Sequence, residues 1–475
     1  MIYPGQNDYY DVDIFNGNFR ELEGKLNEAL EKVTLRKAMI YYGYPIAINN
    51  VWSVEAACNI YKNYSLVVFG DKYNRPDHEV YGETVEIFSR LKEISPDTKI
   101  VGYVPIGCIT GFEDSNLTML QLKERVDLWR NIGADGIFLD EFGYDYRVTR
   151  ARQNEIITYI KSLGMFVFVN AWEIRYIFSE EPVVLDWLDN FSPNPEGLPC
   201  LLDKNDYSLF ENLFHSVEHD DVKDSWVLRC ATPWRIDDAY GYYTRDVGNG
   251  KTYFEMYGTQ MVALDAIPSS MDATSKNILQ TISVFGSRIL NVPYLALGDE
   301  FWGSSGYYND WDLPEIDMSE SVSKGLHAVT IENKSYTTAE GKTEEFPYRW
   351  SAAINGNRYT VVYDIPDPEY ETWADGMRYV TVNDSVVENA WMSIYETKTA
   401  VDRAKAASEE AVKMAEKIKT KVENALPTLT NAEEEMKKIA ADAEKKISDA
   451  EKTLDTGMKD LEMLTAGFQY KERQW

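Results

Sequence analysis

Two adjacent acids, Asp140 and Glu141, directly follow a short apolar run and are the first candidates for chemistry. Residues 136–139 read Gly-Ile-Phe-Leu, which is typical of a strand buried on both faces. Acids at the carboxyl end of a buried parallel strand lie where α/β barrels keep their active sites. The structural alternative is that Asp140 caps the next turn or pairs with a neighbouring arginine.

Other polar and aromatic residues lie at or near the ends of further predicted strands. They are Tyr42, Asp71, Tyr103, Asn170, Trp172, Glu211, Arg229, Asp299 and Glu300. Strand ends converge on one face of a barrel, so we expect these side chains to share a bowl. Several carboxylates with aromatic rings suit glycoside hydrolysis, which needs one protonated acid and a second carboxylate that attacks or stabilises the oxocarbenium ion.

The sequence therefore predicts Asp140 as nucleophile or transition-state stabiliser, with Glu211 or Glu141 as the general acid/base. Predicted substrate-binding residues are Tyr42, Asp71, Tyr103, Asn170, Trp172 and Arg229. Structural roles remain open for several of them: Glu211 as a surface acid, Tyr103 in core packing, Trp172 as a plug of the barrel mouth. Arg229 either contacts substrate or only neutralises Asp140, which would lower the pKa of that carboxyl.

The central part of the chain alternates between strand and helix patterns. Strands are predicted at 37–43, 65–70, 99–104, 136–139, 165–170, 206–211, 225–230 and 294–298, with helices at 78–94, 118–132 and 148–163 and further helical segments after 230. This alternation over about 260 residues predicts a (β/α)8 barrel of the TIM type at 35–305. A doubly wound sheet is disfavoured because no Gly-rich phosphate loop follows the first strand.

The segments on either side of the barrel have different patterns. Residues 1–34 contain a one-sided helical stripe, which predicts an attachment or oligomerisation segment. Alternating residues and Asn-Gly or Asp-Pro turns at 306–392 predict a small antiparallel β domain. Apolar residues recur at +4 and +3 steps from 411 to 443 within 393–475, which predicts a coiled coil needing partner helices. Pro427 leaves a kinked rod and a hairpin both open, and a homo-oligomer is expected, with a trimer favoured by analogy.

The composition excludes several classes of partner. The formal charge is −30, from 78 acidic and 48 basic residues, which argues against nucleic acid and anionic membranes. No apolar run is long enough to insert in a membrane, and the amino-terminal sequence does not resemble a secretory signal. The four Cys and four His residues are scattered, so neither a metal site nor a cofactor is predicted.

Two phrases carry a family resemblance. Ile-Val-Gly-Tyr-Val at 100–104, followed by Gly-Ala-Asp-Gly-Ile-Phe-Leu-Asp-Glu at 133–141, resembles the spherulation-specific family 4 proteins and the related endo-α-1,4-polygalactosaminidase families. The resemblance covers about residues 37–300 and implies a barrel that cleaves galactosamine-containing polysaccharides. It implies that Asp140 is catalytic and that Glu211 is its partner. The long, proline-bearing segment 173–205 departs from the family pattern.

A second resemblance concerns the amino-terminal segment. The phrase Phe-Asn-Gly-Asn-Phe at 15–19 is similar to the start of many bacteriophage tail-fibre and baseplate-attached proteins. It implies a chain in the virion tail, held by other tail or baseplate proteins; the alternative location is a cell surface.

Two functions follow as hypotheses. The first is a tail-associated glycoside hydrolase acting on cell-surface polysaccharide, with amino-sugar polymers as one substrate class. The second is a non-catalytic receptor-binding or structural tail protein that uses the barrel as a carbohydrate-binding module. The distance from Asp140 to a second carboxyl group distinguishes the two functions. A hydrolase requires such a group at about 5–5.5 Å for a retaining pair or about 6.5–9.5 Å for an inverting pair, whereas a binding module requires neither.

Overall fold

The computed structural model describes residues 35–109, 116–220, 225–230, 233–248, 250–268, 271–299, 328–337, 341–354, 356–364, 377–386 and 434–454. Contacts within the chain divide it into two units, Met1–Ala390 and Trp391–Trp475. The predicted amino-terminal segment 1–34, most of the predicted coiled coil and Pro427 lie outside the described residues.

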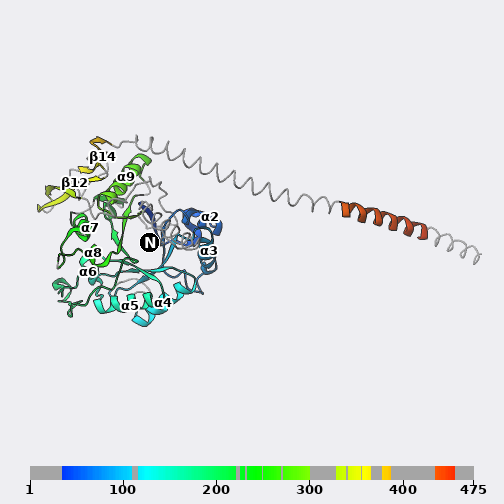
Figure 1. Ribbon diagram of the computed structural model, residues 1–475, viewed down its shortest axis with the longest axis horizontal. Coiled ribbons are helices and arrows are strands. Elements are labelled where there is room, and N and C mark those ends of the chain that lie inside the picture. Colours follow the sequence, from blue (N-terminus) through cyan, green and yellow to red (C-terminus); the bar gives the residue numbers. More distant parts are fainter. Residues whose placement is uncertain are drawn as a thin grey trace, which may run out of the picture. The chain divides into compact units, whose positions relative to one another are not determined.

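The first unit contains a closed barrel of eight parallel strands, as the sequence predicts (Figure 1). Around the ring the order is β1-β10-β9-β6-β5-β4-β3-β2. The strands are β1 (Arg36–Tyr41), β2 (Leu66–Phe69), β3 (Lys99–Pro105), β4 (Gly136–Asp140), β5 (Phe166–Asn170), β6 (Tyr207–Glu211), β9 (Gln260–Ala266) and β10 (Tyr294–Gly298). The prediction of a TIM-type α/β fold is confirmed.

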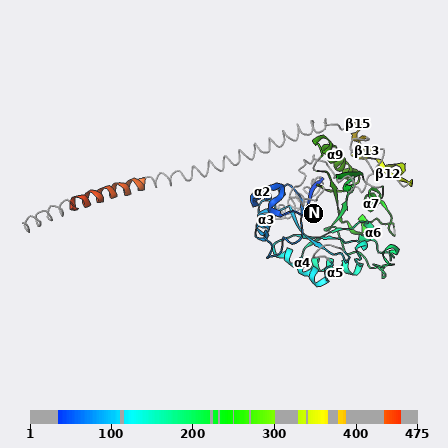
Figure 2. The ribbon, with the colours of Figure 1, turned by 180° about the vertical axis from the view of Figure 1, so that it is seen from behind.

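Helices follow most barrel strands and surround the ring (Figure 2). They are α2 (Val54–Tyr61), α3 (Tyr81–Ile94), α4 (Met119–Asn131), α5 (Arg150–Ser162), α6 (Ile174–Phe178), α7 (Pro233–Thr244), α8 (Tyr253–Tyr257) and α9 (Ala273–Ile289), with 3-10 turns η1 (Pro45–Asn50), η2 (Tyr144–Tyr146) and η3 (Asp186–Leu188). Thr118 and Gln121 form a capping box that starts α4, and Thr149 caps α5. These caps fix the residues at which the loops after β3 and β4 end and the helices α4 and α5 begin.

The barrel is filled by side chains from alternate strand positions. Val101, Phe138, Phe168 and Leu264 belong to one buried cluster, so the interior is a packed core rather than a pore. On the outer side, the ring of Trp129 on α4 lies over β3 at Gly102, where an added Cβ would come within 2.2 Å of that ring.

The structure corrects the prediction for the seventh barrel strand. Residues 225–230 form β8 (Ser225–Cys230), which pairs antiparallel with β7 (His215–Asp220) in a hairpin outside the barrel. The strand between β6 and β10 is instead β9, in a segment predicted to be helical. Its sequence, Gln-Met-Val-Ala-Leu-Asp-Ala, is rich in residues that also favour helices, and a short buried apolar run has no diagnostic period.

A second sheet follows the barrel in the same unit. Five antiparallel strands lie in the order β11 (Val329–Thr337), β12 (Thr343–Ile354), β13 (Asn357–Asp364), β14 (Met377–Val382) and β15 (Ser385–Val386), which confirms the predicted antiparallel sheet. The ring of Phe214 stacks on Trp350 at 6.1 Å, and Phe285 on α9 packs on Tyr359 at 5.7 Å. This sheet therefore packs against the barrel near α9.

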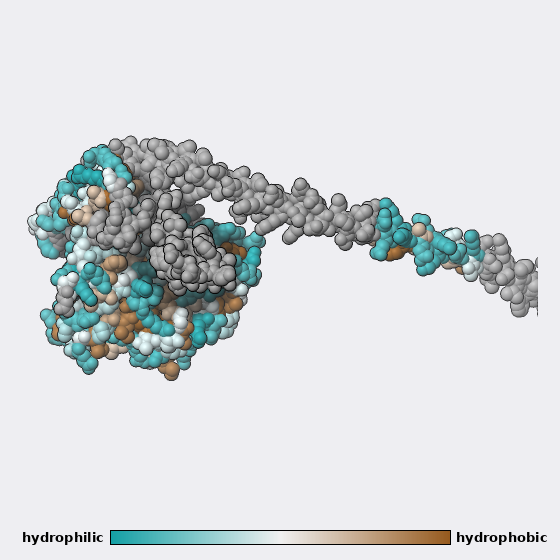
Figure 3. Space-filling model, in the orientation of Figure 1, coloured by the Kyte–Doolittle hydropathy of each residue, from teal (hydrophilic) through white to brown (hydrophobic). Residues whose placement is uncertain are grey.

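The second unit is described only at 434–454, which is one helix. Its apolar side chains face solvent: Met436 is 71% exposed, and Ile439, Ile447 and Leu454 are similarly open. Figure 3 shows scattered hydrophobic atoms on this otherwise hydrophilic helix. The coiled coil itself stays a prediction. Among the described residues, no helix has both the length and the apolar character needed to cross a membrane.

Candidate active site

Three polar side chains end three neighbouring strands of the barrel. Asp140 is the last residue of β4, Asn170 of β5 and Glu211 of β6. Because β4 pairs with β5 and β5 with β6, these residues lie side by side at the carboxyl end of the ring. The alternative interpretation of Glu211 as a surface acid at a helix start is therefore wrong.

The amide of Asn170 links the two carboxylates. Its Nδ2 donates to Oδ1 of Asp140 at 2.9 Å and to Oε2 of Glu211 at 2.9 Å. Two oxygens at that distance from one nitrogen are at most about 5.8 Å apart (twice 2.9 Å), and about 5 Å apart at the roughly 120° geometry of an amide NH₂. This spacing matches the roughly 5–5.5 Å of a retaining pair.

Asp140 receives two further hydrogen bonds. The hydroxyl of Tyr103 donates to its Oδ2 at 2.8 Å, and the backbone N–H of Glu141 donates to its Oδ1 at 2.9 Å. Glu141 adopts a φ of 55°, a left-handed conformation that turns the chain sharply after β4. The side chain of Glu141 is buried, whereas Asp140 and Glu211 each keep partial solvent access.

Burial and the neighbouring charges shift both carboxyl groups. Burial raises the pKa of Asp140, while the donors from Asn170, Tyr103 and the Glu141 N–H act to lower it. Burial also raises the pKa of Glu211, and the charge of Asp140 adds to that rise. Asn170 and the guanidinium of Arg235 oppose it. Asp140 thus has three donors favouring its anion, while Glu211 has a carboxylate neighbour favouring its proton.

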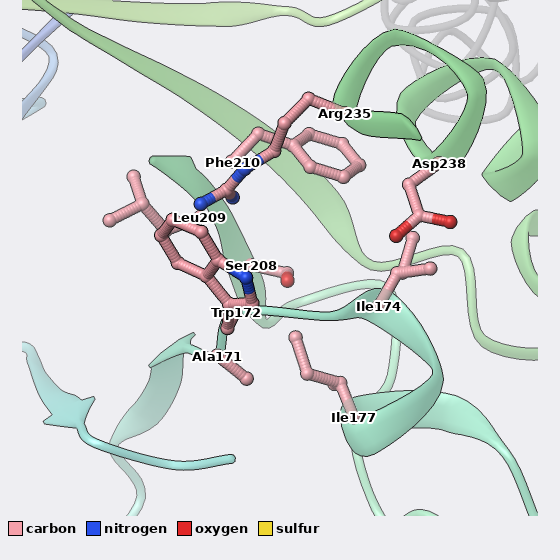
Figure 4. A pocket seen from close by; sticks show the side chains of 9 residues that line it. All are labelled: Ala171, Trp172, Ile174, Ile177, Ser208, Leu209, Phe210, Arg235 and Asp238. Atoms are coloured by element: carbon pink, nitrogen blue, oxygen red, sulfur yellow. The ribbon is translucent and has the colours of Figure 1, made fainter. Parts of the chain in front are cut away.

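A cation–aromatic pair flanks Glu211. The guanidinium carbon of Arg235 on α7 lies 3.8 Å from the ring centroid of Trp172, and Figure 4 shows the two groups face to face. The crevice beneath them, lined by residues of β6, α6 and α7, has no room for a water molecule. Trp172 itself is 50% exposed, so it lies on the rim and does not plug the barrel.

Two residues near the carboxylates were missed by sequence reasoning. Arg235 is one, because its helix follows a segment misassigned to the barrel. Tyr146 is the other: burial, then the charges of Asp140, Asp145, Glu141 and Glu211, raise its pKa to about 12. Tyr146 directly follows the acidic stretch 140–145 in the sequence, and this position could have identified it as a candidate.

The remaining predicted residues lie in different surroundings. Tyr42 contacts the ring of Tyr103. Asp71 forms ion pairs with Arg75 at 3.5 Å and Arg125 at 4.0 Å, so its carboxylate is already matched by cations.

Arg229 lies on β8 of the hairpin, paired with Ser216, and not on a barrel strand. The prediction that Arg229 lies on a barrel strand is therefore wrong, while its contact with substrate or with Asp140 stays a prediction. Asp299 is buried, and Glu300 lies outside the described residues. No group of three or more His, Cys, Asp or Glu residues in the described part of the chain is arranged to hold a metal ion.

Comparisons with known proteins give the following. No protein-family model matches the sequence, and no curated protein matches it. The glycoside hydrolase domain of PelA from Pseudomonas aeruginosa is similar in structure, with a TM-score of 0.31 and 11% identity over 56% of this chain and 96% of that one. D-psicose 3-epimerase has a TM-score of 0.29 and 10% identity over 60% and 94%. The YdjI aldolase from Escherichia coli has a TM-score of 0.28 and 10% identity over 57% and 78%. Structural similarities as weak as these do not indicate which reaction, if any, the chain catalyses.

Proposed function

We propose that the barrel is a retaining glycoside hydrolase with Asp140 as nucleophile and Glu211 as general acid/base. The observation that carries this proposal is the amide of Asn170, which holds the two carboxylates at the spacing of a retaining pair. Burial raises the pKa of both carboxyls, but three donors oppose the rise at Asp140, whereas the charge of Asp140 adds to the rise at Glu211, so we place the proton on Glu211.

The reaction proceeds in two steps. Glu211 gives its proton to the glycosidic oxygen as that bond breaks, and Oδ of Asp140 bonds to the anomeric carbon to form a glycosyl ester. Water then loses a proton to Glu211 and attacks the same carbon, which breaks the ester and restores both carboxyl groups. The hydroxyl of Tyr103 and the amide of Asn170 keep the attacking carboxylate in place.

The substrate class follows from charge and aromatic surface. Asp140, Glu141 and Glu211 gather at the site, with Arg235 as the cation acting on Glu211. This arrangement favours neutral or cationic sugars over acidic ones, and an amino-sugar polymer of a cell surface fits it. The exposed ring of Trp172 offers a face for a sugar ring.

The hydrolase proposal is tested by reducing-end release from a partly de-N-acetylated α-1,4-galactosamine polymer. Glu211→Gln is expected to lower kcat by roughly 10²–10⁴-fold, and Asp140→Asn to abolish turnover, with circular dichroism unchanged. NMR of the first product should show the anomeric configuration of the substrate. Unchanged turnover in both variants would end the assignment, while wild-type binding without cleavage would favour the carbohydrate-binding module.

We also propose that the chain self-associates through helix 434–454 and serves in a virion tail among other tail or baseplate proteins. Met436, Ile439 and Ala443 are followed 11 residues later by Ile447, Ala450 and Leu454, and this repeat favours a nearly straight or right-handed bundle. Light scattering should give a multiple of 54.5 kDa, with three copies expected. Ile439→Lys with Ile447→Lys should yield monomers; a wild-type monomer would refute the assembly. Antibody labelling of purified virions tests the location.

A further inference from the structure

A row of aromatic side chains leads away from the proposed nucleophile. Tyr103, whose hydroxyl binds Asp140, meets the ring of Tyr42 edge-on at 5.5 Å between centroids. The hydroxyl of Tyr73 then donates to the backbone carbonyl of Tyr42 at 2.7 Å. The row thus passes from β3 to the loops after β1 and β2, which are neighbouring strands.

The row ends at an exposed tryptophan on the loop after β1. Tyr73 meets Tyr44 edge-on at 5.8 Å, and Tyr44 meets Trp52 edge-on at 6.4 Å. The hydroxyl of Tyr44 donates to the carboxylate of Glu79, and the ring of His78 packs against Tyr44 at 5.8 Å. Polar groups therefore border the aromatic surface, a combination that suits a sugar ring with its hydroxyls.

The backbone beneath Trp52 is held in an unfavourable conformation. Asn49, Asn50 and Trp52 have φ values of 47°, 59° and 46°, and a bulky residue rarely adopts such a value. The indole N–H of Trp52 donates to Oδ1 of Asn50 at 2.8 Å, which fixes the ring while 58% of the residue stays exposed. An exposed indole in this conformation adds little to stability, and such strain concentrates at functional positions.

The barrel order places Trp52 opposite Trp172, an exposed indole on the loop after β5. Three strands separate β1, which precedes Trp52, from β5, which precedes Trp172, in either direction around the ring. Figures 1 and 2 show the helices that follow, α2 and α6, on opposite sides of the barrel. A polysaccharide that touched both indoles would cross the mouth, where Asp140 and Glu211 lie.

We propose that Trp52 and Tyr44 form a distal sugar-binding subsite at the rim of the barrel mouth, which holds the polymer beyond the sugars that contact the carboxylates. This inference rests on the proposed glycosidase function. Its ligand is a sugar unit several residues away from the cleaved bond, held by stacking on the face of Trp52. Trp172 contacts the polymer on the other side of the carboxylates.

The test compares Trp52→Ala with wild type on two substrates: the partly de-N-acetylated α-1,4-galactosamine polymer and the shortest oligosaccharide of that polymer that wild type cleaves. We expect kcat/KM on the polymer to fall by roughly tenfold, the value of one stacking contact, with activity on the oligosaccharide unchanged. Trp187→Ala, which removes another exposed indole, is the matched control and should change neither value.

A second variant separates binding from folding. Trp52→Gly removes the ring and relieves the positive φ, so its melting temperature should equal or exceed that of wild type while polymer cleavage falls as in Trp52→Ala. A lower melting temperature, an equal loss on both substrates, or an equal loss in Trp187→Ala would overturn the subsite.

Affinity electrophoresis in gels containing the polymer distinguishes this inference from the proposed function. If wild type is retarded without cleaving, and Trp52→Ala is retarded less, the subsite stands although the hydrolase assignment fails. If both proteins are retarded equally, the subsite is refuted and the exposed indole fits a protein contact instead. If wild type is not retarded and does not cleave the polymer, both proposals are refuted.

Discussion

Replacing Asn170 with alanine should move the whole pH–rate profile to higher pH. The substitution removes the two hydrogen bonds of 2.9 Å that favour the ionised forms of Asp140 and Glu211. Without them, the pKa of each carboxyl rises. The acidic limb reports the ionisation of Asp140 and the alkaline limb the loss of the Glu211 proton, so both limbs shift in the same direction.

The size of the shift follows from the strength of one such bond. A hydrogen bond to a charged group contributes about 1.5–3 kcal/mol, and one pH unit corresponds to about 1.4 kcal/mol. A displacement on the order of one unit is expected, because partial solvent access at both carboxyls weakens the effect. At the former acidic limb, kcat/KM should fall by roughly tenfold for that reason alone.

The assay is kcat/KM for reducing-end release between about pH 4 and pH 9, with two comparison variants. Asn194→Ala removes another buried amide, which bonds only loop carbonyls and an N–H of the same excursion, and should leave the profile in place. Arg235→Met removes a charge that lowers the pKa of Glu211 and is not among the causes that shift the pKa of Asp140, so the alkaline limb should move alone. A profile of Asn170→Ala that keeps its position, or moves to lower pH, would refute the bridging role.

Two further predictions concern stability. Burial raises the folded-state pKa of Asp140 above its unfolded value, so ionisation costs stability at neutral pH and that cost disappears as pH falls through the raised pKa. Asp140→Asn should therefore melt higher than wild type at pH 8, with a difference that shrinks toward pH 4; a lower melting temperature at pH 8 would contradict this. Gly102→Ala would place a methyl group 2.2 Å from the ring of Trp129 and should cost about 1–3 kcal/mol in urea unfolding. Gly82→Ala, where a Cβ meets nothing within 4 Å, should be neutral or stabilising.

The barrel strands could be predicted from the sequence where the local pattern is compatible with only one type of secondary structure. The run that ends at Asp140 is buried on every residue before the acid, so its apolar pattern and its polar end were both informative. The strand ending in Glu211 was predicted within one residue of its observed start. These strand ends place the three residues of the candidate site on neighbouring strands.

The errors arise where the structure of a segment depends on residues that are distant in the sequence. Residues 225–230 do form a strand, but their partner is β7 in a hairpin and not a barrel strand. The β9 strand was missed because Met261, Ala263 and Leu264 suit a helix as well as a buried strand. Arg235 acts on Glu211 only because α7 returns to the barrel mouth, and no spacing in the sequence encodes that approach.

The closure of the barrel has a consequence for how the chain matures. The ring is completed where β1 meets β10, with Arg36 opposite Tyr294 and a side-chain hydrogen bond of 2.8 Å across 258 positions of sequence. In a nascent chain, one edge of β1 therefore stays unpaired until β10, which lies 258 positions further along the sequence, has left the ribosome. Such long-range pairing slows folding and exposes intermediates to aggregation, so synthesis rate and chaperone supply should govern the yield of this protein in recombinant hosts.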